Sequence, residues 1–387
     1  MNKIWSKWLS LGLTLTSFSS FADTILIDPD LQDFNDRLSR LETQRTVTLS
    51  ASPRAENGVN LFTFGNVLFW QAHEGSIPIA IETTNPLTTD IPPAPLSVLQ
   101  HGRVKNIEFK WDVGSRIGIG YDWPRDKMDL SLAWLRFFTN SHRALHADTE
   151  EQLYPSQLHP LDGNNNLGPQ GFTPTPSFSN ASAHWYGHLN QLDLDLGRAF
   201  YVGRWFKLRP HFGIRTTWIQ QKLSVSYREN LALNLFSLPG DDYSVRRKSR
   251  WWGIGPEGGL DMSLGLGEGF SLCCDVAGAI EYGFHALKRR EVDTTVANTG
   301  LNGTLVDVGD NFRVSRPIFD LQLGWRWEKK LAQDRCHLTL EMGWEQHVYY
   351  SQHQALYFVD DIEIGSFITH HGDLTFQGWN IAARLDF

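Results

Sequence analysis

The chain has 387 residues and a formal net charge of −8, and it carries no cluster of basic residues of the kind that binds nucleic acids, so we expect no nucleic-acid partner. Its three cysteines are too few for a disulfide framework and are interpreted as small apolar residues, so we expect no metal site and no cofactor. The 33 glycines and 12% aromatic residues favour a membrane β-barrel over a helical protein, because only one face of each barrel strand meets lipid.

The N-terminus has the layout of an export signal. Lys3 and Lys7 precede an apolar run that ends near Leu15, and the small residues Ser20 and Ala22 suit cleavage after residue 22. We therefore predict a signal peptide at 1–22. Its apolar run is shorter than the ~20 residues of a spanning helix, and no later segment reaches that length without charges, so residence in a membrane requires a barrel.

Residues 23–58 are predicted to form a periplasmic segment with one short amphipathic helix at 28–45. Asp28 can cap this helix, Pro29 suits its first position, and apolar residues repeat at heptad spacing between Leu31 and Leu41. Two heptads are too short to be stable alone. Two interpretations stay open: the helix packs against or plugs one end of the barrel, or it forms a small coiled coil that associates subunits.

From residue 59 to residue 387 the hydrophobic period changes to two, which is typical of strands. Ile117, Ile119 and Tyr121, for example, share one face, while Arg116 and Asp122 lie on the other. The first strand is the weakest, because apolar residues fall on both of its faces. The alternation predicts an all-β fold, an antiparallel transmembrane β-barrel of ten to twelve strands, and we place ten at 59–72, 104–122, 127–140, 183–197, 205–224, 248–265, 269–287, 312–328, 335–351 and 373–387.

The connections between these strands alternate in length. Those near 124, 201, 267 and 332 are short, whereas those at 73–103, 141–182, 225–247, 288–311 and 352–372 are long and rich in Pro, Asn, Gly and Ser. Short periplasmic turns opposite long outer loops are the signature of bacterial outer-membrane barrels. An even number of strands then places the N-terminal helix and Phe387 on the same, periplasmic side.

The last strand ends in a pattern that resembles the sorting signal of outer-membrane barrels. The chain stops on an aromatic residue, and apolar residues precede it at every second position. We predict that the barrel assembly machinery reads this signal, which consists of Trp379, Ile381, Ala383, Leu385 and Phe387.

The polar face of the strands is predicted to line the lumen. Over this whole face acidic residues outnumber basic ones, which predicts a mild preference for cations if solute passes. The charged residues that we place in the lumen are Glu108, Lys110, Asp112, Arg116, Asp193, Asp195, Lys207, Arg209, Arg215, Asp320, Arg326, Glu341, Glu345 and Arg384.

A tight turn near 201 would place Asp193 and Asp195 opposite Lys207 and Arg209, as a cross-strand ladder of opposite charges. Such pairs either fill and stiffen a narrow barrel or line a path for solute, and both interpretations stay open. Ten strands predict a narrow pore or none, since ~8 strands enclose a filled interior and ~16 enclose an aqueous channel. Lumenal glycines, such as Gly118, would widen the lumen locally.

Tryptophans are frequent near the strand ends and on the outer faces. Most are interpreted as interfacial anchors rather than as parts of a ligand site. The anchors that we predict are Trp111, Trp134, Trp218, Trp325, Trp327, Trp344 and Trp379.

Two patterns could indicate other chemistry. The string from Gly253 to Gly258 matches a dinucleotide-binding motif, but it lies inside a strand and opens no helix. Outer-membrane barrels can also be hydrolases, and the acidic pair Asp360-Asp361 shares a loop with His370-His371, so these groups could activate water. No carboxylate–imidazole or imidazole–serine pairing on a strand end supports this, and we expect no enzyme.

Several segments together resemble the pore-forming major outer membrane protein family of Legionella and Chlamydia-like bacteria. They are LDLDLG at 192–197, LRPHFG at 208–213, WGIG at 252–255, CHLTLEMGWEQ at 336–346 and GDLTFQGWNIAARLDF at 372–387. The resemblance covers most of residues 59–387. It implies an outer-membrane porin, exposed enough at the cell surface to contact a host, with no catalytic motif.

The sequence therefore predicts a bacterial outer-membrane barrel with a porin-like role, the passive passage of small solutes or ions, and a structural role in the envelope. The alternatives are a surface adhesin that uses the barrel as a scaffold for its long loops, and an outer-membrane hydrolase. The partners expected are outer-membrane lipid and lipopolysaccharide, the barrel assembly machinery, small solutes or ions, a second copy of the chain, and a host surface ligand.

Overall fold

The computed structural model describes residues 60–75, 77–83, 102–123, 126–148, 151–159, 177–203, 205–230, 241–331, 336–358 and 367–387. The predicted signal peptide at 1–22, the segment 23–58 and its helix at 28–45 lie outside the described residues. In the part of the chain that is described, no helix is both long enough and apolar enough to cross a membrane.

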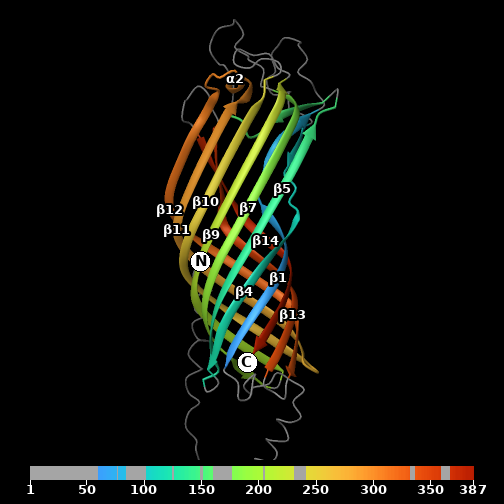
Figure 1. Ribbon diagram of the computed structural model, residues 1–387, viewed down its shortest axis with the longest axis vertical. Coiled ribbons are helices and arrows are strands. Elements are labelled where there is room, and N and C mark those ends of the chain that lie inside the picture. The colour runs from blue at the N-terminus through green and yellow to red at the C-terminus, as the bar shows by residue number, and fades with distance from the viewer. Residues whose placement is uncertain are drawn as a thin grey trace, which may run out of the picture. The chain divides into compact units, whose positions relative to one another are not determined.

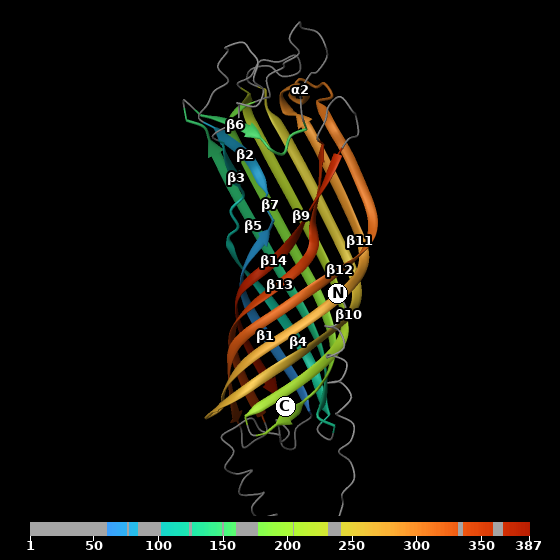
Figure 2. The same ribbon diagram turned by 180° about the vertical axis from the view of Figure 1, so that it is seen from behind.

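Ten antiparallel strands close into a barrel, which confirms the predicted fold (Figures 1 and 2). Each strand pairs with the next along the chain, and β1 closes the ring because it pairs with both β14 and β4. The barrel strands are β1 (Leu61–Glu74), β4 (Trp111–Trp123), β5 (Met128–His146), β7 (Phe178–Arg198), β9 (Phe206–Asn230), β10 (Tyr243–Gly267), β11 (Phe270–Asp293), β12 (Thr304–Leu331), β13 (Cys336–Phe358) and β14 (Phe367–Asp386).

The shorter elements lie at the two ends of the barrel. They are β2 (Pro78–Thr83), β3 (Arg103–Asn106), β6 (Gln152–Pro155), β8 (Phe200–Val202) and the one-turn helix α2 (Thr294–Asn298). Figure 2 shows β2, β3 and β6 at the end of the long loops, where β2 pairs with both other strands. The predicted second strand, 104–122, is therefore wrong in extent: it is two strands, because Ile107 leaves the ladder to bond the carbonyl of Ile77.

At the long-loop end most strands extend beyond the predicted strands. The segments 141–182, 225–247, 288–311 and 352–372 were predicted to be loops, but they contain the ends of β5, β7, β9, β10, β11, β12, β13 and β14. At about 3.3 Å per residue and a tilt of about 40°, the 25 residues of β10 rise roughly 60 Å along the barrel axis, about twice the height of a hydrocarbon layer. Polar outward side chains mark these extensions, and the search for apolar outward rows missed them for that reason.

The backbone conformation of the turn between β10 and β11 explains why two glycines occur there. Gly267, Glu268 and Gly269 all have positive φ angles, 114°, 53° and 83°, and a glycine reaches this region without the cost that a β-carbon adds. Replacing Gly269 would also place a β-carbon 2.4 Å from the carbonyl oxygen of Glu328. This turn fixes the register of two long strands at the short-turn end of the barrel.

An apolar belt surrounds the half of the barrel next to the short turns, where the outward side chains of neighbouring strands form continuous rows. In one row Phe69 pairs with Val113 and Trp379, and Trp379 pairs in turn with Trp344. The stretch of β10 from Trp252 to Leu264 spans roughly 30 Å along the barrel axis, which fits an apolar band of about 25 Å with its aromatic borders.

The predicted anchors and the C-terminal pattern lie on this outer face. Trp111, Trp134, Trp218, Trp325, Trp344 and Trp379 are exposed and Trp327 is half-buried. Ile381, Ala383, Leu385 and Phe387 are exposed on the same side of β14, whereas Asp386 is buried on the other. On β1 the structure resolves the ambiguity of the sequence: Leu61, Val67 and Phe69 face outward, and Phe62, Leu68 and Trp70 face inward.

A charge network and a polar cavity in the barrel interior

One buried arginine organises the interior at mid-height. Arg215 of β9 is only 4% exposed, and its Nε donates to Asp193 on the neighbouring strand β7 at 2.8 Å. Its two terminal nitrogens donate to Glu257 of β10 and to Asp320, which reaches it from β12. A single guanidinium therefore ties together strands that are not neighbours in the sheet, through charge-assisted hydrogen bonds.

The contacts continue to the opposite wall through His347 of β13. Its Nδ1 lies 2.7 Å from Asp320, and its Nε2 lies 3.5 Å from Glu345 on the same strand. Glu345 accepts hydrogen bonds from Arg116 of β4 at 3.2 Å and from the indole of Trp70 at 2.9 Å. We call these charged residues, Asp193, Arg215, Glu257, Asp320, His347, Glu345 and Arg116, the charge network.

A polar cavity of about 250 Å³ lies between the charge network and the short turns. Arg209 spans part of it, since it donates to Asp129 of β5 at 2.9 Å and to Asp261 of β10 at 2.5 Å. Arg326 donates to Glu341 at 2.9 Å on the other side. At about 30 Å³ per water molecule, the cavity has room for several waters. The charged side chains that line it are Arg116, Asp129, Lys207, Arg209, Asp261, Asp275, Arg326, Glu341 and Arg384.

Three potential metal ligands meet beside the charge network. Ligand atoms of Asp195, His211 and Glu257 lie within 4.8 Å of one another on the adjacent strands β7, β9 and β10. Gly213 lies between the two carboxylates in the register, and a β-carbon there would be 2.4 Å from Oδ1 of Asp195, so the glycine keeps this space open. One oxygen of each carboxylate is buried without a hydrogen-bond partner in the described part of the chain. Oxygen and imidazole ligands in this arrangement could hold a divalent cation.

Aromatic side chains fill the interior on the long-loop side of the charge network. The ring of Trp70 lies 5.3 Å from that of Phe137 and 6.0 Å from that of Phe376, and Tyr349 contacts Phe376 at 5.9 Å. On the facing wall, the guanidinium of Arg316 lies 4.7 Å from the ring of Trp251. We call this set of buried side chains, Trp70, Phe137, Tyr349, Phe376, Trp251 and Arg316, the packed layer.

Beyond the packed layer, chain segments that connect the strands enter the interior. Tyr227 donates to the carbonyl of Ile79 at 2.6 Å, and Gln157 donates to the carbonyl of Pro78 at 2.6 Å. Arg289 of β11 holds the second segment by donating to the carbonyl of Gln157 at 2.6 Å. The interior near the long loops is therefore occupied by protein.

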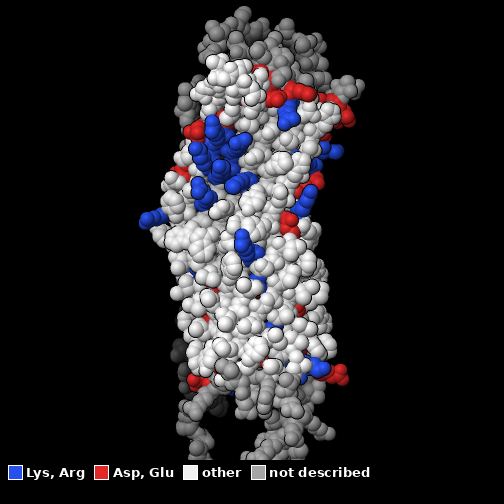
Figure 3. Space-filling model, viewed as in Figure 1, with Lys and Arg blue, Asp and Glu red and all other residues white. Residues whose placement is uncertain are grey.

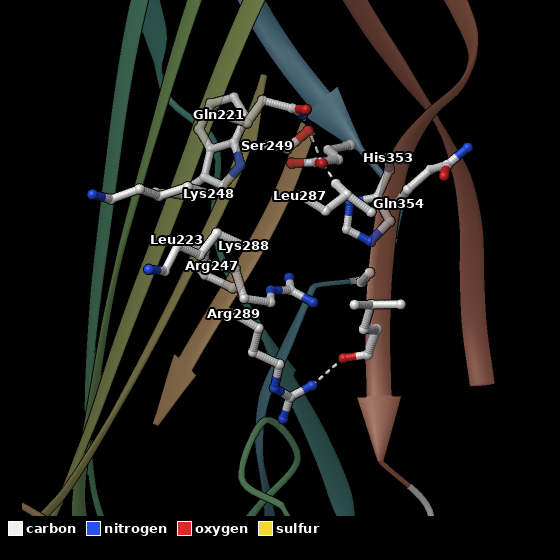
Figure 4. A pocket seen from close by; sticks show the side chains of 14 residues that line it. Gln221, Leu223, Arg247, Lys248, Ser249, Leu287, Lys288, Arg289, His353 and Gln354 are labelled. Atoms are coloured by element: carbon white, nitrogen blue, oxygen red, sulfur yellow. Dashed lines mark hydrogen bonds and ion pairs between the residues drawn. The ribbon is translucent and has the colours of Figure 1, made fainter. Parts of the chain in front are cut away.

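The small space that remains there is lined by both apolar and charged side chains. Figure 4 shows Arg247 and Arg289 extending toward the strand that carries His353 and Gln354. The cavity measures about 30 Å³, enough for about one water molecule. Arg289 is paired with Glu291, and Arg247 donates to the hydroxyl of Tyr357 at 3.0 Å, so these cations stabilise the inserted segments.

The structure places most of the predicted lumenal charges in these contacts, but not all. Glu108 and Lys110 lie in the segment between β3 and β4, outside the strands, and the Glu108 side chain is 72% exposed and pairs with Arg143 at 2.8 Å. Asp112 accepts a hydrogen bond from the backbone of Asn140 at 3.2 Å. Lys207 and Arg384 line the polar cavity.

The predicted ladder between the two aspartates of β7 and the start of β9 is wrong. Asp193 pairs with Arg215 and Asp195 with Gly213, whereas Arg209 lies opposite Asp261 on β10. The short strand β8 adds residues between β7 and β9, so the centre of the turn lies later in the chain than 201. The two aspartates of β7 are therefore paired with residues further along β9 than predicted.

The expectation that glycines widen the lumen is also wrong on β4. A β-carbon on Gly118 would lie 2.2 Å from the ring of Phe64, and one on Gly120 would lie 2.1 Å from the ring of Phe62. On Gly114 it would lie 2.7 Å from the ring of Phe137. The missing side chains are replaced by phenylalanine rings from neighbouring strands, so these glycines permit packing rather than passage.

Sequence reasoning missed several interior residues. Arg316 has the same parity along β12 as Asp320, so the strand period alone could have placed it inside. Arg247 and Arg289 were assigned to loops, and the strand extensions that carry them had no apolar outward row as a signal. Among the other candidates, Asp360 and Asp361 lie outside the described residues, and His371 is exposed on β14.

Residues 56–387 match the family model described as Legionella pneumophila major outer membrane protein precursor. The chain belongs to this family. It is thus an outer-membrane protein, and the membership confirms the resemblance noted in the sequence. No curated protein matches the chain.

Solved structures with a similar arrangement include other outer-membrane barrels. The outer membrane protease OmpT from Escherichia coli has 10% identity and a TM-score of 0.39, with coverage of 86% of this chain and 97% of that one. The translocator domain of the autotransporter NalP from Neisseria meningitidis has 10% identity and a TM-score of 0.28, with coverage of 92% and 98%. A Pseudomonas aeruginosa FadL homologue has 9% identity and a TM-score of 0.28, with coverage of 85% and 90%. Similarity at this level carries no functional assignment for this chain.

Proposed function

We propose that this outer-membrane barrel passes small cations at low conductance. The observation that carries the proposal is the polar cavity of about 250 Å³, lined by charges of both signs, inside a barrel with an apolar belt. Charges are costly to remove from water, and an interior made only for stability could be apolar. A water-accessible charged interior suits the passage of hydrated ions instead.

A carboxylate cluster supports cations as the solute. The polar cavity itself is lined by five basic and four acidic side chains, but beside the charge network Asp195, His211 and Glu257 converge, and one oxygen of each carboxylate is buried without a hydrogen-bond partner in the described part of the chain. Rings or clusters of carboxylates favour cations in narrow pores, because they replace part of the lost hydration. We assign to these three residues the role of a cation-binding site along the path of the ion through the barrel.

The packed layer limits the rate at which ions pass through the barrel. Trp70, Phe137 and Phe376 occupy the interior beyond the charge network, so an ion passes only when these rings move. Rotation of buried aromatic rings is intermittent in a close-packed interior. The expected signature is brief openings of small conductance rather than a steady large current.

Planar-bilayer recording with the purified full-length protein tests the proposal. In a potassium chloride gradient, the reversal potential should correspond to cation preference, and Glu257→Gln should reduce that preference. Asp307→Asn, on the exposed outer face of β12, is the matched control and should leave it unchanged. Anion selectivity, or equal effects of the two variants, contradicts the proposal.

A purely structural barrel is the second candidate, and the packed layer is the observation that favours it. It predicts no current at all from protein whose folding is verified by its heat-modifiable migration in gels. Replacing Phe137 by alanine would then create a cavity but still no conductance. Under the channel proposal, the same variant should conduct more than the parent, because one obstacle is smaller.

We further propose that the barrel is not a hydrolase. Among the described residues, the contact most similar to a serine–histidine catalytic pair is Ser249 with Nε2 of His285 at 2.7 Å. Arg316 donates to the other ring nitrogen, so Nε2 carries the hydrogen and donates to the serine, which prevents it from acting as a base. A peptide-cleavage assay checks this: turnover by the parent that disappears in Ser249→Ala would overturn it.

A further inference from the structure

Six basic side chains gather on the outer face of the barrel, on three adjacent strands. We call them the basic patch: Lys222 of β9, Arg246, Lys248 and Arg250 of β10, and Lys288 and Arg290 of β11. All six are exposed, and they point away from the interior because they alternate with buried residues such as Val245 and Leu287. Figure 3 shows a dense group of basic side chains on the upper part of this face.

The register places like charges directly opposite one another. Arg246 pairs with Arg290, and Lys248 lies between Lys222 and Lys288 in one row across three strands. Facing side chains at such positions have β-carbons about 4.5–5.5 Å apart, and equal charges there destabilise a sheet. The fold alone therefore gains nothing from this arrangement, which suggests an anionic ligand.

The described part of the chain supplies little compensating negative charge. Lys288 lies 3.2 Å from Asp307, and Lys222 lies 5.5 Å from the ring of Tyr186. Asp307 lies opposite Arg290 in the register but forms its ion pair with Lys288, and in the same described residues no carboxylate forms an ion pair with Arg246, Lys248, Arg250 or Arg290. Most of the positive charge is thus available to a ligand.

The patch lies directly next to the apolar belt. One row nearer to the short turns, Trp252 pairs with Trp218 and with Phe284, and all three are exposed. Below them Ile254 and Tyr282 continue the belt. A ligand that satisfies both surfaces carries several negative groups on one side and hydrocarbon chains on the other, at the height where the bilayer meets water.

We propose that the basic patch binds the phosphate groups of lipopolysaccharide in the outer leaflet, with the acyl chains of the lipid against the row of Trp218, Trp252 and Phe284. Arg246 and Arg290 suit bidentate contacts with one phosphate, and Lys248 and Lys288 act as point charges on the same or a second phosphate. The lipid thereby neutralises the repulsion that the register creates. The inference is independent of conductance and stands if the barrel is closed.

The test uses the purified full-length protein in detergent freed of lipid, with Arg246→Gln/Arg290→Gln as the variant. The dissociation constant for lipopolysaccharide should rise roughly tenfold to hundredfold, since two charge-assisted contacts are lost. The control variant Arg198→Gln/Lys329→Gln removes the same charge from exposed positions at the short-turn end and should bind as the parent does. Equal loss in both variants, or loss in neither, overturns the proposal.

Thermal unfolding provides a second readout that a general folding defect would not reproduce. Without lipid, the double variant should unfold at a higher temperature than the parent, because the repulsion is relieved. Added lipopolysaccharide should raise the unfolding temperature of the parent more than that of the variant, and dephosphorylated lipid A should raise neither. Stronger stabilisation of the parent by inorganic phosphate or by heparin than by lipopolysaccharide would identify a soluble anion as the ligand and reject the lipid.

Discussion

The two halves of the barrel use the same strands with opposite polarity. Near the short turns the outer face is apolar, with residues such as Ile254, and the inner face is charged, with Glu257. Near the long loops the outer face carries Arg246 and Lys248, and the inner face carries Val245 and Tyr243. The change occurs within β10 itself, around Trp251 and Trp252, without any change in the period of two.

The comparison shows which solvent each half meets. Hydrocarbon around the first half favours apolar side chains outside and leaves the polar ones to pair inside. Water around the second half restores the order of a soluble protein, with an aromatic and aliphatic core inside. The half near the short turns therefore has the polarity of a membrane protein, and the half near the long loops has that of a water-soluble β-protein. The strands are continuous through both halves, and substitutions should act differently in the two.

The largest effect is expected in the interior of the membrane half. Arg215→Leu leaves Asp193, Glu257 and Asp320 buried without their shared cation, and removing one partner of a buried charge pair costs about 3–5 kcal/mol. The variant should fail to assemble or should unfold at much lower urea concentration in detergent. Arg313→Leu, on the exposed face of β12, is the control and should change stability by less than about 0.5 kcal/mol. Comparable losses would show that the charge network does not hold the strands together.

A somewhat smaller effect is expected in the core of the other half. Phe137→Ala removes a fully buried ring that packs on Trp70 and Phe376, and such a cavity costs about 3 kcal/mol. Phe138→Ala on the same strand truncates an exposed ring and should cost clearly less. Urea unfolding of both variants measures the contrast. If the two costs were equal, the interior of this half would not be a packed core.

An arginine introduced on the outer face tests directly whether a position meets hydrocarbon or water. Ile280 is 61% exposed in the apolar belt, and Ile280→Arg should cost about 2–3 kcal/mol in a bilayer. Ala144→Arg, on the outer face of β5 beyond the belt, should be close to neutral. Unfolding in lipid vesicles is the measurement, and a neutral result at Ile280 would place that position outside the hydrocarbon.

The sequence predicted the membrane half better than the half that meets water. Alternation of the apolar residues Phe319 and Leu321 with the polar residues Asp320 and Gln322 is a strong local signal, and the same kind of alternation placed the other strands and the C-terminal pattern. The run Arg246-Arg247-Lys248 does not by itself predict the basic patch, because the strand alternation turns Arg247 inward and only the register brings Arg290 beside Arg246. The contact of Arg215 with Asp320 forms only when the sheet closes into a barrel, and no local sequence pattern predicts which residues then meet.

The smallest effect concerns pH on the outer face of the half that meets water. The ring centroids of His142 and His184 are 4.2 Å apart on β5 and β7, and partial burial together with the neighbouring imidazole lowers the pKa of His184. As pH falls through the ordinary histidine value of about 6.5, the unfolded chain gains a proton that the folded barrel accepts only at lower pH, so stability decreases with falling pH. His184→Gln should therefore show a smaller drop in unfolding temperature between pH 7.5 and pH 5.5 than the parent. His146→Gln is the control, since that ring contacts Asn180 at 2.6 Å rather than a second imidazole. If the drop in unfolding temperature were the same in His184→Gln as in the parent, protonation of His184 would not contribute to the pH dependence of stability.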